Sequence, residues 1–335
     1  MKKRLTAIFV AAAVIVAIVV VRRNDAVYQH DSGFIFGTSY NVTYECHENL
    51  KAEIERLLAG VDASLSPFND TSVITHVNRN EAVALDRYFV EVFTLASTVY
   101  DDTDGAFDIT VAPLVNAWGF GFKSGKHPDS NTVDSIMQFV GFDKVGIADG
   151  KVEKKDPRIM LDCSAIAKGY GVDVVAEYLK SKGIGNFMVE IGGEVVTAGK
   201  NPKGAPWRIG VSKPDDDSLN VNKELQGILS LTDKAMATSG NYRNFYYRDG
   251  KKYAHTIDPK NGYPIQHSLL SATVLTDRCA KADAYATAFM VMGLEKAQTL
   301  LQRRPDLMAY LIYSDDNGQM KVWYSLSLKA NVELQ

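Results

Sequence analysis

Apolar residues recur at helical spacing in several segments of the chain. In segment 48–64 five of them fall on one helical face, namely Leu50, Ile54, Leu57, Leu58 and Val61. Four further segments are predicted to be helical, at 86–103, 128–140, 164–182 and 279–302. Gly183 follows the third of these, at a position where glycine commonly ends a helix. The stretch 65–80 is rich in turn-forming residues and is predicted to be a connection.

Alternating or short apolar runs predict strands between these helices. The predicted strands cover 34–45, 187–192, 195–199, 207–212, 228–233 and 269–276. Asp-Gly and Asn-Gly pairs predict hairpins or short paired strands at 144–160, 244–257 and 308–325. Two further stretches are predicted to be turns, Gly192-Gly193 and Ser239-Gly240-Asn241. No linker divides the body of the chain, so we expect one catalytic domain at 34–330, of α/β or α+β class, with mixed sheets and helices.

The N-terminus has a different pattern. The sequence MKKR is followed by an apolar run at 5–21 and then by Arg22 and Arg23. A positive flank before an apolar run is typical of an export signal. We predict a signal anchor or signal peptide at 1–23 and a polar linker at 24–33, and we favour the anchor because no clear cleavage site follows the run. The domain would then lie on the periplasmic side of the inner membrane. A buried core helix is the alternative for this run.

Composition and charge exclude several classes of function. The net charge is -3 and the basic residues are scattered, which is not the footprint of a nucleic-acid-binding protein. The three cysteines lack a CxxC spacing and the six histidines lie far apart, so a structural zinc site is not expected. No Walker A sequence is present, and the glycines of GFGFKSG have the wrong spacing for a dinucleotide fingerprint.

The stretch LDCSAIAKGYGVD is the first candidate for chemistry. Asp162 or Ser164 could cap the helix that follows. Small side chains at a helix start leave N–H groups free for an anion, and Lys168 adds a positive charge one turn later. The alternative is an ordinary capped helix with a surface lysine.

Three other clusters carry side chains suited to a ligand or to proton transfer. Phe107 could stack on a planar ring and Asp108 could bind a polyol or a ring N–H. His255 stands at the end of a predicted hairpin before two tight turns, a suitable place for a general base. Asp283 and Thr287 lie on one helix face, and their oxygens suit Mg²⁺. Each has a purely structural alternative: a turn before a core strand, a hydrogen-bonded histidine, and an acid near a helix N-terminus.

The order and wording of these stretches together are more specific than any one of them. They read GAFDITVAPLVNAWGF, LDCSAIAKGYGVD, VEIGGEV, ATSGNYRNF, HTIDPKNGYP and ADAYATAFMVMG. In this the chain resembles the ApbE family of FAD:protein FMN transferases. The resemblance implies an elongated cleft that binds FAD, Mg²⁺ at the pyrophosphate, and transfer of FMN to a threonine of an exported acceptor protein with release of AMP. The family expectation for that acceptor is a respiratory redox subunit.

The resemblance also implies roles for particular residues of this chain. The FAD contacts would be Phe36, Phe68, Ala106, Phe107, Asp108, Asp162, Lys168 and Ile257. The metal ligands would be the carbonyl of Ala165 and the side chains of Asp283 and Thr287. His255 would stand beside the transferred phosphoryl group as the base, with Asp283 as the alternative base.

Several positions depart from the family pattern, and two other functions stay open. Cys163 replaces a leucine and is expected to point into the core, and Phe36 stands where methionine is common. Ser164-Ala165 also replace Gly-Gly, which keeps small residues where the backbone would approach the ligand. A Mg²⁺-dependent FAD pyrophosphatase would use the same site with water in place of threonine. A non-catalytic flavin-binding module is the other alternative. The chain lacks the acceptor pattern Asp, two residues, Ser/Thr-Gly-Ala-Thr, which favours the donor enzyme.

Overall fold

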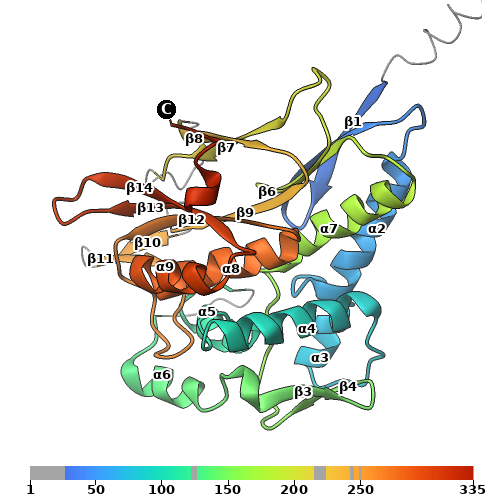
Figure 1. Cartoon of the computed structure of the whole chain (residues 1–335). Coiled ribbons are helices and arrows are strands. Elements are labelled where there is room, and N and C mark those ends of the chain that lie inside the picture. The colour runs from blue at the N-terminus through green and yellow to red at the C-terminus, as the bar shows by residue number, and fades with distance from the viewer. Residues whose placement is uncertain (1–26, 122–126, 215–223, 242–244, 249–250, 335) are drawn as a thin grey trace, which may run out of the picture.

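An eight-stranded antiparallel sheet forms the centre of the molecule (Figure 1). The computed structural model describes residues 27–121, 127–214, 224–241, 245–248 and 251–334. The strands run in the order β1 (Tyr28–Ile35), β2 (Thr38–Glu45), β5 (Phe187–Ile191), β6 (Glu194–Ala198), β9 (Lys234–Gly240), β12 (Leu269–Thr276), β13 (Met308–Ser314) and β14 (Met320–Tyr324). In β12 every residue except Leu270 is buried, as expected of a strand covered on both faces.

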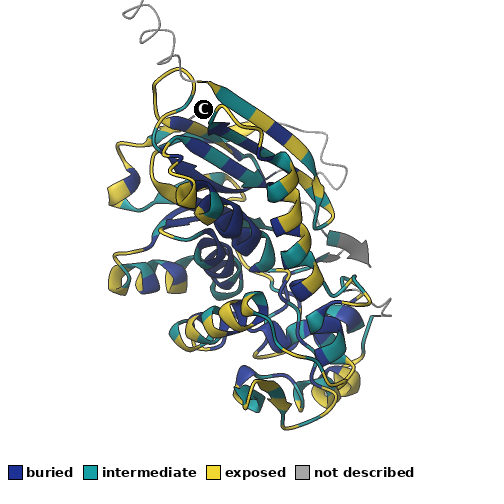
Figure 2. Cartoon of the chain, turned by 90° about the vertical axis from the view of Figure 1, so that its right-hand side faces the viewer, coloured by how far each residue is buried: buried dark blue, intermediate teal, exposed yellow. Residues whose placement is uncertain are grey.

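Helices cover one face of this sheet. They are α2 (Lys51–Leu65), α3 (Val73–Asn78), α4 (Arg87–Asp102), α5 (Ala112–Ala117), α6 (Ser130–Met137), α7 (Ala167–Ser181), α8 (Cys279–Met292) and α9 (Leu294–Arg303). Helix α8 lies between the sheet and α4, and almost all of its residues are buried (Figure 2). Its alanine-rich sequence lets neighbouring elements approach from every side.

A smaller sheet covers the opposite face. It has the order β15 (Val332–Leu334), β8 (Leu225–Leu231) and β7 (Trp207–Ser212). Apolar residues of β7 and β8 pack with Met236, Leu275 and Tyr310 of the large sheet. Within the described residues, the remaining strands form two hairpins. One pairs β3 (Val145–Ala148) with β4 (Lys151–Lys154), and the other pairs β10 (Phe245–Arg248) with β11 (Lys251–Ala254). Three short 3₁₀ turns are also present in the described residues.

Most predicted elements are present, and the differences have local causes. The strand predicted at 34–45 is a hairpin, because the chain reverses at Phe36 and Gly37, both with positive φ. Its first strand begins at Tyr28, so part of the predicted linker 24–33 is paired. The helix predicted at 279–302 breaks at Gly293, whose φ is +76°.

Two elements lie where turns were predicted. The stretch 65–80 contains the short helix α3, which Ser72 caps by accepting a hydrogen bond from the backbone N–H of Thr75. Ser239 and Gly240 form the end of strand β9, paired with β12. The turn predicted at Gly192-Gly193 is confirmed, since both residues have positive φ between β5 and β6.

The predicted signal anchor at 1–23 lies outside the described residues. Within the described part of the chain, none of the helices has the length and apolar character needed to cross a bilayer.

Candidate active site

One cleft of about 930 Å³ brings together every residue that the sequence assigned to a site. It lies between the N-terminal ends of α7 and α8, the ends of strands β6 and β9, and the loops before α3 and α5. The predicted residues that line it are Phe36, Phe68, Ala106, Phe107, Asp108, Asp162, Ala165, Lys168, His255, Ile257, Asp283 and Thr287. These positions are far apart in the sequence, so the fold supports reading them as one site.

The residues before α7 form a turn that presents backbone to the cleft. The helix begins at Ala167, and Ile166 at its N-cap provides no side-chain hydrogen bond. The predicted cap at Asp162 or Ser164 is therefore wrong. Asp162 Oδ1 instead accepts a hydrogen bond from the backbone N–H of Ser164 at 2.7 Å. This turn leaves Ala165 half-buried in the cleft wall.

Two residues of α7 hold it tightly against α8. A Cβ atom at Gly169 would overlap the backbone carbonyl of Cys279, so only glycine allows this approach. Asp173 accepts hydrogen bonds from the backbone N–H groups of Cys279 and Ala280 at 2.7 and 3.0 Å. A side chain of α7 thus caps the N-terminus of α8, whose own N-cap residue, Arg278, makes no such bond. The two helices form one rigid wall of the cleft.

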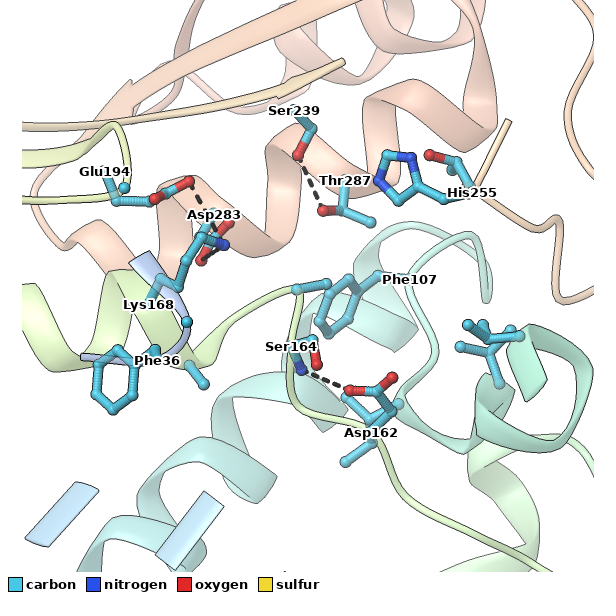
Figure 3. Close-up of a pocket in the computed structure, with 18 of the residues that line it drawn as sticks. Phe36, Phe107, Asp162, Ser164, Lys168, Glu194, Ser239, His255, Asp283 and Thr287 are labelled. Carbon is cyan, nitrogen blue, oxygen red and sulfur yellow. Dashed lines mark hydrogen bonds and ion pairs between the residues drawn. The ribbon is translucent and has the colours of Figure 1, made fainter. Parts of the chain in front are cut away.

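Lys168 stands between two buried carboxylates on this wall (Figure 3). Its Nζ lies 3.6 Å from Glu194 Oε1 and 3.8 Å from Asp283 Oδ2. Burial alone would lower the pKa of Lys168, but the negative charges of Asp283 and Glu194 outweigh it and raise the pKa. Burial raises the pKa of both carboxyl groups, which the ammonium of Lys168 opposes. The lysine is therefore held as a cation.

Glu194 is the site residue that sequence reasoning missed. It is only 3% exposed, and its Oε2 accepts no hydrogen bond from the described residues. It follows directly after Gly192-Gly193, whose tight turn starts β6 at the cleft. The signal was present in the sequence as an acid at the start of an otherwise apolar strand.

An oxygen set suited to Mg²⁺ lies beside this ion pair. Asp283 Oδ2 accepts a hydrogen bond from the backbone N–H of Gly169 at 3.1 Å, which aims the carboxylate at the start of α7. Thr287, one turn later, is half-buried while its neighbours in α8 are buried. Together with the Ala165 carbonyl these are hard oxygen donors, and a cluster of three His, Cys, Asp or Glu side chains is not found in the described part of the chain. The residues fit one Mg²⁺ ion held by mixed oxygen ligands.

His255 and Ile257 belong to the opposite wall. His255 lies next to Thr287, and its ring centroid is 6.5 Å from that of Phe120 (Figure 3). The following turn is rigid, because Asp258 accepts hydrogen bonds from Lys260 and Asn261 and the backbone of Ile257 bridges to Pro264. The imidazole therefore lies beside Thr287, one of the oxygen donors named above.

Aromatic rings line the outer parts of the cleft. Phe36 has a φ of +52°, a strained value for a bulky residue, and its ring packs against Gly171. Phe68 is 74% exposed, whereas Phe107 is buried. All three predicted FAD-contact residues line the cleft, and Phe68 and Phe107 differ sharply in exposure.

The side chains of Asp108 and Cys163 are buried and contact other protein groups. Asp108 Oδ1 accepts hydrogen bonds from the N–H and hydroxyl of Thr110, and Oδ2 accepts one from the N–H of Phe142. Burial raises the pKa of Asp108 to about 6. A ligand would meet this residue mainly through its backbone, because both carboxylate oxygens are engaged. Cys163 points into the core as predicted, and burial raises the pKa of its thiol.

Comparisons with known proteins agree on one family. A family model described as the ApbE family matches residues 36–312. The FAD:protein FMN transferase of Vibrio cholerae serotype O1 is 38% identical over 311 residues, which cover 90% of this chain and 91% of that protein. The FAD:protein FMN transferase of Haemophilus influenzae is 38% identical over 304 residues, with 86% and 87% covered.

Solved structures give the same result. The flavin transferase ApbE from Vibrio cholerae superposes with a TM-score of 0.82 at 36% identity, covering 91% of this chain and 99% of that chain. The apo form of the flavinyl transferase ApbE from Pseudomonas stutzeri superposes with a TM-score of 0.81 at 30% identity, covering 91% and 97%.

Proposed function

The chain belongs to the ApbE family of flavin transferases, and from this premise we propose that it moves the FMN half of FAD onto a threonine hydroxyl of an acceptor protein and releases AMP. The observation that carries the proposal is the single cleft that gathers a metal-type oxygen set, a lysine and a histidine with aromatic rings on either side. Phosphoryl transfer needs positioning and charge neutralisation more than covalent help from the protein.

FAD would lie along this cleft with its pyrophosphate at the α7–α8 wall. Lys168 offers the phosphates a cation that Glu194 and Asp283 hold in place. The turn before α7 lets backbone approach the phosphates closely, since its side chains are small. Phe36, Phe68 and the 106–108 segment would contact the flat rings of the substrate.

Mg²⁺ would be held by the Ala165 carbonyl, the Asp283 carboxylate and the Thr287 hydroxyl. When bound, it supplies charge stabilisation at the pyrophosphate oxygens and at the leaving group. Asp283 would then be committed to the ion, which leaves His255 as the base.

In the proposed transfer step His255 acts as the base. The threonine oxygen of the acceptor forms a bond to the phosphorus of the FMN half, and the bond from that phosphorus to the bridging oxygen breaks. AMP leaves with the bridging oxygen. His255 takes the threonine proton, a role that an imidazole commonly has as a general base.

The test is to incubate the protein with FAD, MgCl₂ and a peptide that carries the pattern Asp, two residues, Ser/Thr-Gly-Ala-Thr. We expect a yellow, fluorescent peptide that carries covalently bound FMN, and one AMP released for each peptide modified. A peptide whose final threonine is replaced by valine is the matched control and should stay colourless. Free FMN and AMP without labelled peptide would overturn the proposal in favour of a pyrophosphatase.

We propose further that the acceptor is an exported protein and that residues 1–23 anchor the enzyme in the inner membrane, with its cleft on the periplasmic side. The support is the apolar run at 5–21 behind MKKR. N-terminal sequencing of the protein from a membrane fraction tests this. An intact Met1 in that fraction is expected, and recovery of a shortened chain in the periplasmic fraction would contradict the anchor.

A further inference from the structure

A hydroxyl pair joins strand β9 to the proposed metal ligand on α8. Ser239 Oγ lies 3.0 Å from Thr287 Oγ1, and either atom could be the donor. Both side chains are half-buried and line the cleft (Figure 3). Ser239 has no assigned role so far, and its Oγ makes no other hydrogen bond to the described residues.

The proposed metal site decides the direction of this hydrogen bond. A hydroxyl has one proton to donate and two lone pairs to accept with. If Thr287 gives a lone pair to a cation, its proton must point away from the cation, and Ser239 Oγ is the acceptor 3.0 Å away. Thr287 is then the donor, so the proton of Ser239 is free to point into the cleft.

The position of Ser239 would let this hydroxyl donate a hydrogen bond to a phosphoryl group in the cleft. Ser239 lies near the end of β9, where the strand leaves its pairing with β12. Two residues later, Asn241 Oδ1 accepts a hydrogen bond from Thr256 at 2.8 Å, and Thr256 follows His255. Ser239 therefore stands where the metal-ligand helix meets the segment that carries His255. A phosphoryl group between these two elements would have a non-bridging oxygen within its reach.

We propose that Ser239 is a catalytic residue that donates a hydrogen bond to a non-bridging oxygen of the phosphoryl group being transferred. At the same time its Oγ accepts a hydrogen bond from the hydroxyl of Thr287. This rests on the proposed function. A fixed donor aimed at oxygens that gain charge in the transition state lowers the barrier without any rearrangement. The same bond orients Thr287 for the metal, as an outer partner of a ligand does.

The test compares Ser239→Ala and Ser239→Thr with the wild type. At saturating MgCl₂, we expect Ser239→Ala to lower kcat about 10²-fold, as loss of one transition-state donor does. The KM for FAD should change less than about threefold, because a donor used in the transition state contributes little to ground-state binding. Ser239→Thr keeps the hydroxyl and should recover at least a tenth of wild-type kcat. A kcat of Ser239→Ala within about threefold of wild type would overturn the proposal.

A metal titration separates the donor role from a purely orienting one. We expect Ser239→Ala to bind Mn²⁺ about 10-fold more weakly, measured as free Mn²⁺ by electron paramagnetic resonance without substrate. If excess MgCl₂ fully restores kcat, Ser239 only orients Thr287 and the donor role is wrong. Because Mn²⁺ binding needs no turnover, an unchanged Mn²⁺ affinity also contradicts the Thr287 bond, even if wild type fails to label the peptide.

Ser271→Ala is the matched control. Ser271 lies on the neighbouring strand β12, opposite Gly240 in the register, and its buried hydroxyl does not line the cleft. The substitution removes the same group from the same sheet, so wild-type kcat and Mn²⁺ affinity are expected. A loss equal to that of Ser239→Ala would assign the effect to the sheet and overturn the proposal.

Discussion

On one side of the cleft the site residues come from two helices that share a buried seam, and on the other they come from loops and strand ends that reach solvent. The helical wall comprises Lys168 of α7 and Asp283 and Thr287 of α8, with Ala165 in the turn that leads into α7. Here Asp283 is 2% exposed and its carboxylate is fixed by Gly169. The outer rim comprises Phe36, Phe68 and His255; here Phe68 is 74% exposed.

This contrast separates two tasks. The carboxylate of Asp283 on the helical wall is almost fully buried, where electrostatic interactions are strong and a charge must be compensated in advance. The pairing of Lys168 with two carboxylates provides that compensation. The rim instead offers flat apolar surface and one imidazole ring, which we propose bind the substrate and receive a proton. Changes on the wall should therefore abolish chemistry, whereas changes of the aromatic rim residues Phe36 and Phe68 should mostly tune binding.

The largest effect is expected from Asp283→Asn on the helical wall. The amide keeps the shape but loses the charge that would hold Mg²⁺, a loss worth several kcal/mol of transition-state stabilisation, or about 10³-fold in rate. Peptide labelling followed over a series of MgCl₂ concentrations measures it. Asp277→Asn, at an exposed position just before the same helix, should leave the labelling rate within about twofold. A wild-type dependence on MgCl₂ in Asp283→Asn would contradict the metal assignment.

His255→Ala tests whether the rim contributes chemistry as well as binding. Loss of a general base should lower the transfer rate about 10²-fold, while FAD affinity measured by quenching of flavin fluorescence stays near wild type. The two variants should differ in one respect. The labelling rate of His255→Ala should still depend on the MgCl₂ concentration as in wild type, whereas that of Asp283→Asn should not. Near wild-type labelling by His255→Ala would contradict the assignment of His255 as the base and show that another group accepts the proton.

The sequence predicted more of the site than of the framework that supports it. All twelve predicted residues line one cleft, because the quoted stretches combine the order and wording of a family with residue types that suit phosphate, metal and flat rings. Their individual roles stay predictions. Glu194 was missed because a single acid in an apolar strand gives no spacing signal until the fold brings it to Lys168.

Long-range packing explains the remaining differences. The cap of α8 comes from Asp173, which is 106 positions away from Cys279 in the sequence, so local capping rules could not find it. Strand β9 was read as a turn at Ser239-Gly240, since its pairing with β12 and β6 is visible only in the sheet. The break at Gly293 was hidden by continuous apolar spacing on both sides.

Gly169→Ala tests the seam behind the helical wall without replacing a proposed metal ligand. The added methyl group would overlap the carbonyl of Cys279, and overpacking of this kind costs about 1–3 kcal/mol of unfolding free energy. Urea denaturation measures the loss. Gly146→Ala is the matched control, because a Cβ there meets no atom within 4 Å and φ is not positive. Equal stability of the two variants would show that the helices can separate, and that the wall is less rigid than inferred.

The smallest effect is expected from Phe68→Ala on the rim. A ring that stacks on a flat ligand contributes about 0.5–1.5 kcal/mol beyond its buried area, which corresponds to a Kd for FAD about 2- to 10-fold weaker. Because the side chain is 74% exposed, unfolding free energy should change by less than about 0.5 kcal/mol. Phe34→Ala removes an equally exposed phenylalanine that does not line the cleft, and should leave FAD affinity unchanged. If kcat falls in Phe68→Ala while FAD affinity holds, the aromatic part of the rim also takes part in the chemistry, and the division between the two sides of the cleft is wrong.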